Sequence, residues 1–200
     1  LKILCKNKKN IFFGGAFFGD HACLIANKFR ETMIYCFEPV SKQRFYLMKN
    51  KIKNKLWNLF ISKKALFNVK NKKLYIKENK KDDGDISLTR NKKKNSNFFL
   101  TDSLDNFTKN NKIEKIDVLM IDVEGNELNV LLGAQSLLKN NKLDNIIFEV
   151  HSKYVNWNRG LKNTAIIKLL MKHNYKIFSI RDYHSNIKLK KNIELLGLEN

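Results

Sequence analysis

The clearest pattern in the sequence is an apolar run that ends abruptly at acidic residues. Residues 117–121 are rich in apolar and β-branched side chains, which predicts a buried strand, and Asp122, Glu124 and Gly125 follow directly. A helical pattern then begins at once. Its leucines recur at mostly three- and four-residue spacings and are Leu128, Leu131, Leu132 and Leu138. Because open α/β sheets bind ligands at the carboxyl ends of parallel strands, Asp122 and Glu124 are candidate site residues.

A second strand-to-helix pattern lies near the start of the chain. The apolar run 11–13 precedes a Gly-rich turn over residues 14–19, and residues 20–30 predict a helix. Such a turn suits a nucleotide-type ligand, because Gly permits close backbone approach and a helix N-terminus offers free N–H groups. Residues 33–37 predict the next strand, which ends at Glu38. A carboxylate there can accept both hydroxyls of a ribose, although a solvated loop acid is the alternative.

The remaining predicted helices and strands alternate along the chain. Residues 41 to about 59 predict one long helix, and residues 65–69 predict the third strand of the sheet. The residues expected on the inner face of that helix are Phe45, Met48, Ile52 and Leu56. Further elements are expected at 74–76 and 86–88 (a hairpin), 98–101 (strand), 103–105 (a helix start), 145–150 (strand), 164–172 (helix), 175–180 and 193–198 (strands).

This alternation predicts a fold of the α/β class. We expect a Rossmann-like, doubly wound, mostly parallel sheet of seven strands, with an inserted β-hairpin near residues 70–90. Two hundred residues are enough for one domain with a full core, and no linker divides them, so residues 1–200 are expected to form a single domain. The chain begins at Leu1 rather than Met, which is consistent with a missing native N-terminus.

Cysteine usage and hydropathy bear on location. Cys5, Cys23 and Cys36 are odd in number and lack metal-ligand spacing, which favours a reducing compartment and makes a cytoplasmic location the default expectation. The longest apolar stretches are too short to span a membrane, and none is flanked like a signal peptide. No transmembrane segment is therefore predicted.

The net charge of +20 suggests an anionic partner, with nucleic acid as the first candidate. A bias toward Lys, Asn, Phe and Ile, with a single Pro, is also what an AT-rich genome would encode whatever the function. Only five of the 39 basic residues are Arg, the residue suited to bidentate phosphate contacts. Nucleic-acid binding is therefore disfavoured, whereas a basic surface still favours polysaccharides or lipid headgroups.

Five segments together resemble a known family. They are FGGAFFGDH at 13–21, CFEPV at 36–40, SLD at 103–105, IDVEGNEL at 121–128 and FEVH at 148–151. In order and spacing they are similar to the FkbM family of S-adenosylmethionine-dependent methyltransferases, over residues of about 11 to 151. The segment IDVEG is the most specific of them. The resemblance implies the class I methyltransferase form of the fold and S-adenosylmethionine as the cofactor.

The resemblance also implies roles for individual residues. Gly15, Ala16 and Gly19 would shape the loop around the methionine part of the cofactor. Glu38 would hold the ribose, Ala65 would lie close to the adenine, and Asp122 would face the reactive end. The catalytic candidates are Asp122, Glu124, Glu149 and His151. The role of Asp105 is open, with helix capping as one reading. His21 is expected to cap or pack near the first helix.

Two positions depart from the family pattern. Phe13 stands where the family usually has Asp, and Phe17 where it usually has Asn. The first change removes a carboxylate expected to anchor the cationic methionine end of the cofactor, and the second adds bulk to the loop. A non-catalytic binding or scaffold protein of the same fold is therefore one alternative function.

The leading prediction is an O-methyltransferase acting on a hydroxyl of a sugar, a glycan or a small metabolite. Methyl transfer to a hydroxyl needs in-line alignment and a base to take the proton. His151 is slightly favoured as that base because imidazole titrates near neutral pH, the alternative being a structural histidine at a strand end. Residues 122–125 lack the Asn/Asp-Pro-Pro-aromatic tetrapeptide of base N-methylating enzymes, which leaves ribose methylation of nucleic acid as the other alternative. No metal is expected, since no ligand pattern is present.

Overall fold

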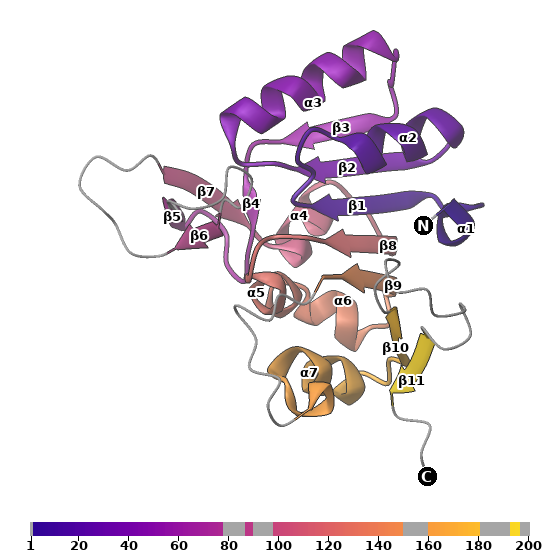
Figure 1. Cartoon of the computed structure of the whole chain (residues 1–200), viewed down its shortest axis with the longest axis vertical. Coiled ribbons are helices and arrows are strands. Elements are labelled where there is room, and N and C mark those ends of the chain that lie inside the picture. Colours follow the sequence, from indigo (N-terminus) through magenta and orange to yellow (C-terminus); the bar gives the residue numbers. More distant parts are fainter. Residues whose placement is uncertain (1, 78–86, 90–97, 150–159, 181–192, 197–200) are drawn as a thin grey trace, which may run out of the picture. The chain divides into compact units, whose positions relative to one another are not determined.

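The computed structural model describes residues 2–77, 87–89, 98–149, 160–180 and 193–196 (Figure 1). Its contacts divide the chain into two compact units, residues 1–154 and residues 155–200. In the first unit the elements are α1 (Lys2–Cys5), β1 (Asn10–Gly14), α2 (Asp20–Lys28), β2 (Met33–Phe37), α3 (Ser41–Lys53), β3 (Leu59–Ser62), β4 (Ala65–Leu66), β5 (Lys73–Lys77), β6 (Ser87–Thr89), β7 (Phe98–Asp102), α4 (Leu104–Asn110), β8 (Ile116–Ile121), α5 (Glu127–Leu132), α6 (Gln135–Lys139) and β9 (Leu143–Phe148). In the second unit they are a 3-10 turn (Leu161–Asn163), α7 (Ala165–Lys172), β10 (Ile177–Ile180) and β11 (Ile193–Leu196).

The centre of the first unit is a sheet of five strands in the order β3-β2-β1-β8-β9. All four neighbouring pairs are parallel, as the arrows in Figure 1 show. Phe13 of β1 sits opposite Cys36 of β2 on one side and Met120 of β8 on the other. The chain continues from β1 to β2 on one side, whereas β8 lies on the other. The strand order therefore reverses direction at β1, and the space at the carboxyl ends of β1 and β8 is a topological switch point.

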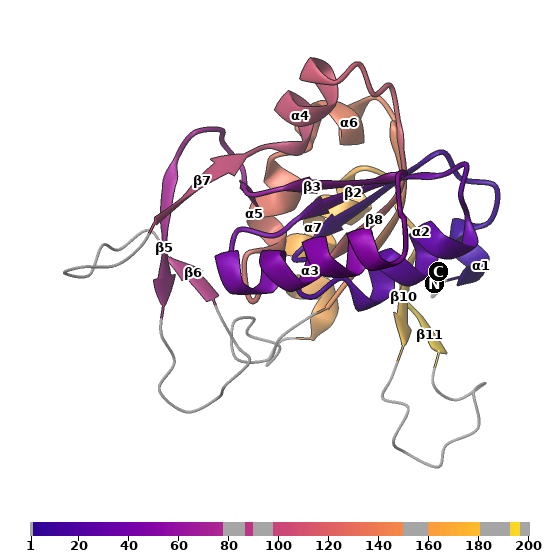
Figure 2. The same cartoon turned by 90° about the horizontal axis from the view of Figure 1, so that it is seen from above.

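Helices cover both faces of this sheet (Figure 2). The view from above shows α2 and α3 on one face and α4 and α6 on the other. Buried aliphatic side chains such as Ile11, Ile25 and Leu47 fill the α2–α3 side. The α4 side is aromatic, with ring centroids 4.6 Å apart for Phe12 and Tyr35 and 4.9 Å apart for Phe37 and Phe107. The α/β, doubly wound, parallel architecture predicted from the sequence is thus confirmed.

The predicted count of seven strands is not confirmed. Among the described residues the central sheet has five strands, and the two C-terminal strands form a separate two-stranded sheet of the second unit. β10 and β11 pair with each other in antiparallel register, with Ile177 opposite Leu196. Both strands lie within the segments where the sequence predicted them. An apolar period identifies a strand but does not specify the sheet in which it pairs.

The third strand of the sheet was predicted at the wrong place. It is β3, whereas residues 65–69, predicted as that strand, contribute the short β4 to another sheet. The predicted helix ran to about Leu59 because no Gly or Pro marks its end. Instead, α3 ends at Lys53, and Lys55 adopts a left-handed φ of 51°. The N–H of Leu56 then bonds back to the carbonyl of Lys51, 3.0 Å away, and the chain enters β3.

A second sheet in the order β4-β7-β5-β6 extends beyond the carboxyl ends of the central strands (Figure 1). β5 and β6 form the predicted hairpin, with Ile76 opposite Leu88. β7 joins β5 in antiparallel register and β4 in parallel register. Leu74 on β5 is buried with Ala65 and Phe67 in a small core of their own. This arrangement places β4 and β5 beside the switch point.

The inner face of α3 is not the one the sequence predicted. Leu47 and Gln43 are buried, whereas Phe45, Met48 and Ile52 are exposed. Of the predicted inner-face residues only Leu56 is buried, and it lies beyond the helix end. Apolar side chains occur on both sides of this helix, so their spacing does not determine which side packs on the sheet.

Asp105 has a structural role that explains its place in the SLD segment. Its carboxylate accepts the backbone N–H groups of Ser136 (2.8 Å) and Leu137 (3.0 Å) at the start of α6. Its own N–H donates to the carbonyl of Gly133 (2.9 Å). A Cβ on Gly133 would lie 2.2 Å from the carbonyl oxygen of Phe67, so only Gly fits there. Asp105 therefore caps a helix, as one reading of the sequence proposed.

The observed orientation of α3 can be tested with a pair of substitutions. Leu47→Ala should lower the free energy of unfolding by about 3 kcal/mol, because it leaves a cavity in the core. Phe45→Ala should lower it by less than about 1 kcal/mol, because the ring is exposed. Urea denaturation of both variants measures the difference. Comparable losses, or a larger loss for Phe45→Ala, would contradict the observed packing of α3.

Candidate functional site

A cavity of about 520 Å³ opens at the carboxyl ends of β1, β2 and β8. This volume is within the usual range of small-molecule sites. Apolar side chains such as Phe37, Leu66 and Leu74 form part of its wall, together with the Gly-rich turn and the loop that follows β8. The cavity therefore lies at the switch point where the sequence placed the site.

Gly15 brings the three strand ends together. Its N–H donates to the carbonyl of Phe37 (3.0 Å), and the N–H of Asp122 donates to the carbonyl of Gly14 (2.9 Å). Gly15 has a φ of +77°, and a Cβ at this position would lie 1.8 Å from the carbonyl oxygen of Asp122. Any side chain at position 15 would push β1 away from β8, because a backbone carbonyl cannot yield as a flexible side chain can.

Glu38 is a buried carboxylate in the wall of the cavity. One oxygen accepts the N–H of Phe17 (2.8 Å) and the other accepts the N–H of Val40 (2.9 Å). Burial raises the pKa of Glu38 to about 7, against the lowering effects of these two donors and of Arg44. The guanidinium of Arg44 donates to the backbone carbonyls of Glu38 and Pro39. Each carboxylate oxygen has a further lone pair, so Glu38 can still accept hydroxyl groups of a ligand.

The loop after β8 is organised by a buried carboxylate that the sequence analysis did not assign. Glu127 accepts the N–H groups of Val123 (3.2 Å) and Gly125 (3.1 Å). Within this loop Glu124 adopts a left-handed φ of 51°. Such a conformation costs free energy in a residue other than Gly, and it is found preferentially at functional sites. Asp122 and Glu124 both line the cavity.

The other predicted site residues divide into three groups. Ala16, Ala65 and Glu149 line the cavity, and the N–H of Glu149 bonds to the carbonyl of Ile121 (3.3 Å). Gly19 is not among the lining residues; it precedes α2 with a φ of +81° and packs against Leu47. His151 lies outside the described residues, so its catalytic role remains a prediction.

Phe13 and Phe17 leave the cavity open. Phe13 is buried in the core beneath the cavity, and Phe17 is 42% exposed at its edge. Phe17 adopts a left-handed φ of 50°, and its ring contacts that of Phe18, with centroids 3.9 Å apart. Its backbone N–H holds Glu38, a contact that does not depend on the side chain. The volume of about 520 Å³ remains with both rings in place.

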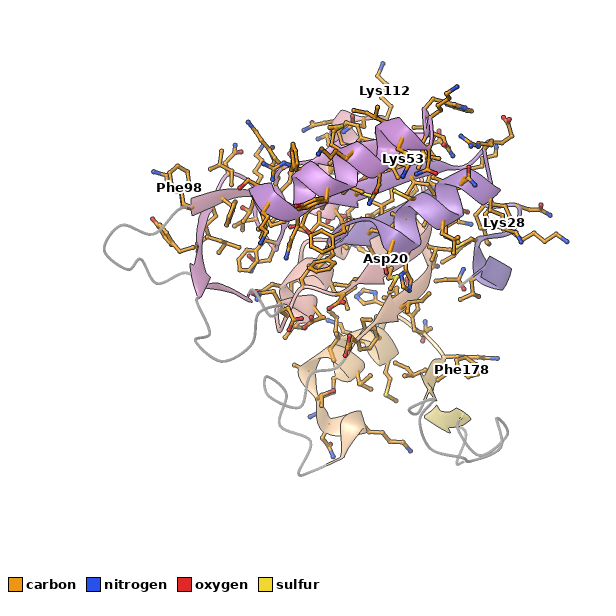
Figure 3. The ribbon with its side chains drawn as sticks, turned by 45° about the horizontal axis from the view of Figure 1, so that its top comes forward. Asp20, Lys28, Lys53, Phe98, Lys112 and Phe178 are labelled. Carbon is orange, nitrogen blue, oxygen red and sulfur yellow. The ribbon has the colours of Figure 1, made fainter. Side chains whose placement is uncertain are left out.

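The structure adds an acid–imidazole pair to the site. Nδ1 of His21 lies 2.8 Å from Oδ2 of Asp20, and both residues line the cavity. Figure 3 shows Asp20 at the first turn of α2. From the sequence, His21 was expected to cap or pack near the first helix. Its position directly after the Gly-rich turn was the available signal, because that turn ends at the ligand side of the sheet.

The lining of the cavity is acidic although the whole chain is strongly basic. Among the described residues that line it there are five carboxylates and neither Lys nor Arg. The carboxylates belong to Asp20, Glu38, Asp122, Glu124 and Glu149. An interior of this kind favours a ligand that carries positive charge and disfavours one that carries phosphates.

Neither a metal centre nor a membrane span is found in the part of the chain that the structure describes. No group of three or more His, Cys, Asp or Glu residues there has a geometry that could hold a metal ion. No helix there combines the length and the apolar character needed to cross a bilayer.

The sequence was compared with known protein families and with curated proteins. A family model described as the methyltransferase FkbM domain matches residues 14–177, which is most of the chain. The match begins in the Gly-rich turn and includes Glu38, Asp122, Glu124 and Glu149. No curated protein gives a significant match.

Because the carbonyl of Asp122 lies so close to Gly15, adding one methyl group at position 15 should lower the stability of the fold considerably. Gly15→Ala should lower the free energy of unfolding by about 3 kcal/mol or more, because it adds a steric clash to an unfavourable φ. Gly160→Ala is the matched control: its φ is +82°, but no described residue lies within 4 Å of a Cβ there, so about 1 kcal/mol is expected. Chemical denaturation measures both. Equal costs would show that the backbone φ alone, and not the contact with Asp122, requires Gly15.

Proposed function

The chain belongs to the FkbM methyltransferase family, and on that premise we propose that it is an S-adenosylmethionine-dependent O-methyltransferase. The acceptor we propose is a hydroxyl group of a sugar, a glycan or a small metabolite. The acidic lining of the cavity is the observation that supports this proposal most strongly. S-adenosylmethionine carries a sulfonium and an ammonium group, and both are stabilised by nearby carboxylates.

The residues present fit this cofactor. Glu38 would accept the ribose hydroxyls through the lone pairs left after its bonds to Phe17 and Val40. The apolar wall at Ala65 and Leu66 suits the adenine ring. Gly15 and Ala16 would let the backbone approach the methionine part closely. Phe13 offers no carboxylate there, and Asp20 and Asp122 line the same cavity and would supply the negative charge.

The cofactor, when bound, would supply an electrophilic methyl group on a sulfonium. That methyl group would pass from the sulfur to the acceptor oxygen, and the chain would supply the base that takes the hydroxyl proton. The chain's own contribution is to align the two groups and to hold that base. We assign the base to one of Asp122, Glu124, Glu149 and His151.

The same lining is an argument against the nucleic-acid alternative. A ribose methyltransferase must bring a phosphodiester backbone to its cavity, and the described lining residues offer no cation to meet it. The scaffold alternative rested on Phe13 and Phe17. Because a cavity of about 520 Å³ remains beside both rings, a catalytic function is the better-supported proposal. The three free cysteines support a reducing, cytoplasmic location within this proposal.

Cofactor binding tests the proposal directly. Calorimetric titration of the whole chain with S-adenosylmethionine and S-adenosylhomocysteine should show saturable micromolar binding. Glu38→Gln should weaken it by about tenfold or more, because hydrogen bonds to a charged acceptor are lost. The matched control Glu31→Gln, at an exposed acid, should leave affinity unchanged. Absence of binding up to millimolar ligand, in a folded sample, would contradict the proposal and favour the scaffold alternative.

The raised pKa of Glu38 gives binding a characteristic pH dependence. Hydroxyl donors stabilise the ionised carboxylate, so bound ligand would lower the pKa from about 7 and release a proton. Affinity should therefore rise as the pH increases from 6 to 8, and titrations at pH 7 in buffers of different ionisation enthalpy should detect the released proton. Glu38→Gln should remove both effects while Glu31→Gln keeps them. Pronounced proton release in Glu38→Gln would place the titrating group elsewhere.

If one of the four candidate residues is the base, its removal should lower turnover far more than it lowers cofactor affinity. Transfer of a tritiated methyl group from S-adenosylmethionine to a panel of sugars and hydroxylated metabolites should identify an acceptor. With that acceptor, removing the base by Asp122→Asn, Glu124→Gln, Glu149→Gln or His151→Ala should lower kcat by about 10²- to 10⁴-fold in at least one variant. The affinity for S-adenosylhomocysteine in that variant should change far less. Wild-type turnover in all four variants would rule out the assignment.

A further inference from the structure

The outer side of α3 is an exposed apolar stripe. Phe45, Met48 and Ile52 are 55%, 41% and 68% exposed, and their spacing places them on one side of the helix. Leu47, on the opposite side, is fully buried against the sheet. We call the stripe formed by Phe45, Met48 and Ile52 the α3 face. All three side chains are exposed, which distinguishes this side from the buried side of the same helix.

The α3 face continues into an open groove beside the sheet edge. The groove lies between α3 and β3, which is the last strand on that side of the central sheet. Phe45 and Met48 form one wall, and Ile61 of β3 adds an apolar surface to the other. The remaining wall is basic, with Lys63 and Lys64. Figure 1 shows α3 lying outside β3 at this end of the sheet order.

Positive charge surrounds the α3 face, although Lys64 is paired with Asp102, with Nζ 2.9 Å from Oδ2. No Asp or Glu occurs in the sequence between Glu38 and Glu78, whereas residues 41–64 contain eight Lys or Arg residues. On α3 itself Lys49 lies over the ring of Phe45, with Nζ 4.6 Å from the ring centroid. Lys53 is exposed at the end of the helix, where Figure 3 shows it. This excess of cations favours an anionic partner for the α3 face.

We propose that the α3 face docks the chain onto the surface of an anionic lipid bilayer. A helix that lies in the membrane interface buries its apolar side at the boundary of headgroups and acyl chains and keeps Lys at the headgroups. Lys suits this arrangement because its long apolar stem can follow the apolar surface while its ammonium group stays in water. Each Lys near such a surface adds to the attraction toward anionic headgroups.

Other occupants fit these observations less well. In a two-fold dimer formed through this face, the cations of one copy would meet those of the other, with no acid from residues 39–77 to compensate. A nucleic acid would match the charge but would leave Ile52 and Met48 without a partner. An acidic protein remains as a testable competitor. A bilayer interface matches both the apolar stripe and the positive charge, and it does not require a complementary shape.

Vesicle flotation tests the proposal with the whole chain. The chain should bind vesicles of phosphatidylcholine with about one third phosphatidylserine and should not bind phosphatidylcholine alone, because the attraction requires anionic headgroups. Phe45→Ser combined with Ile52→Ser should lower the partition coefficient by about tenfold or more, since both side chains leave the interface. Lys49→Gln combined with Lys53→Gln should lower it by a similar factor, with less salt dependence.

Matched controls carry the same chemical changes elsewhere. Phe98→Ser with Leu132→Ser removes two exposed apolar side chains, and Lys28→Gln with Lys112→Gln removes two exposed cations; both pairs should bind nearly as the wild type does. Equal losses in control and test pairs, or no preference for anionic vesicles, would overturn the proposal. A lipid-free dimer that Phe45→Ser with Ile52→Ser disrupts would assign the face to a second copy. Binding to polyglutamate with that same loss would assign it to an acidic protein. Unchanged thermal unfolding of each variant confirms that folding is intact.

Discussion

Gly15 holds the ends of three parallel strands within hydrogen-bonding distance of one another. Its N–H reaches Phe37 on one side, and its missing Cβ leaves room for the carbonyl of Asp122 on the other. The positions of Glu38, directly after β2, and of Asp122, directly after β8, both follow from this contact. The cavity at the switch point is therefore a consequence of backbone geometry first. Its side chains act on a ligand only because the strands that carry them are held together at this point.

Carboxylates then give this geometry its chemistry in two ways. The buried Glu127 and the partly buried Asp105 act within the fold: Glu127 bonds the loop after β8, and Asp105 caps α6. Glu38 is bonded to two backbone N–H groups but still faces the cavity. Burial raises its pKa to about 7, so its charge near neutral pH depends on what the cavity holds. The free energy spent on burying this carboxylate makes it responsive to a ligand that donates hydrogen bonds.

Charge is distributed unevenly over the first unit. The net charge of +20 would suggest that anions are attracted everywhere, yet the cavity is lined by carboxylates. Basic residues lie instead on surfaces such as those that flank the α3 face. A net charge describes long-range attraction, whereas a binding site is governed by the groups within a few ångströms. The acidic cavity and the basic helix are thus compatible with two different partners, a cationic cofactor and an anionic surface.

Local sequence patterns predicted the α/β class, the positions of β1, β2 and β8, and the grouping of Gly15, Glu38 and Asp122 at one end of the sheet. These features depend on local patterns, because an apolar run, a Gly-rich turn and a carboxylate at a strand end each have a direct physical meaning in sequence. Long-range contacts make β3, and not residues 65–69, the next strand of the sheet, and they place Glu127 where it bonds the loop after β8. They also set which side of α3 packs inward. Both sides of that helix carry apolar residues, so their spacing does not predict which side is buried. Leu47 and not Phe45 is buried because Leu47 packs in the core against the sheet.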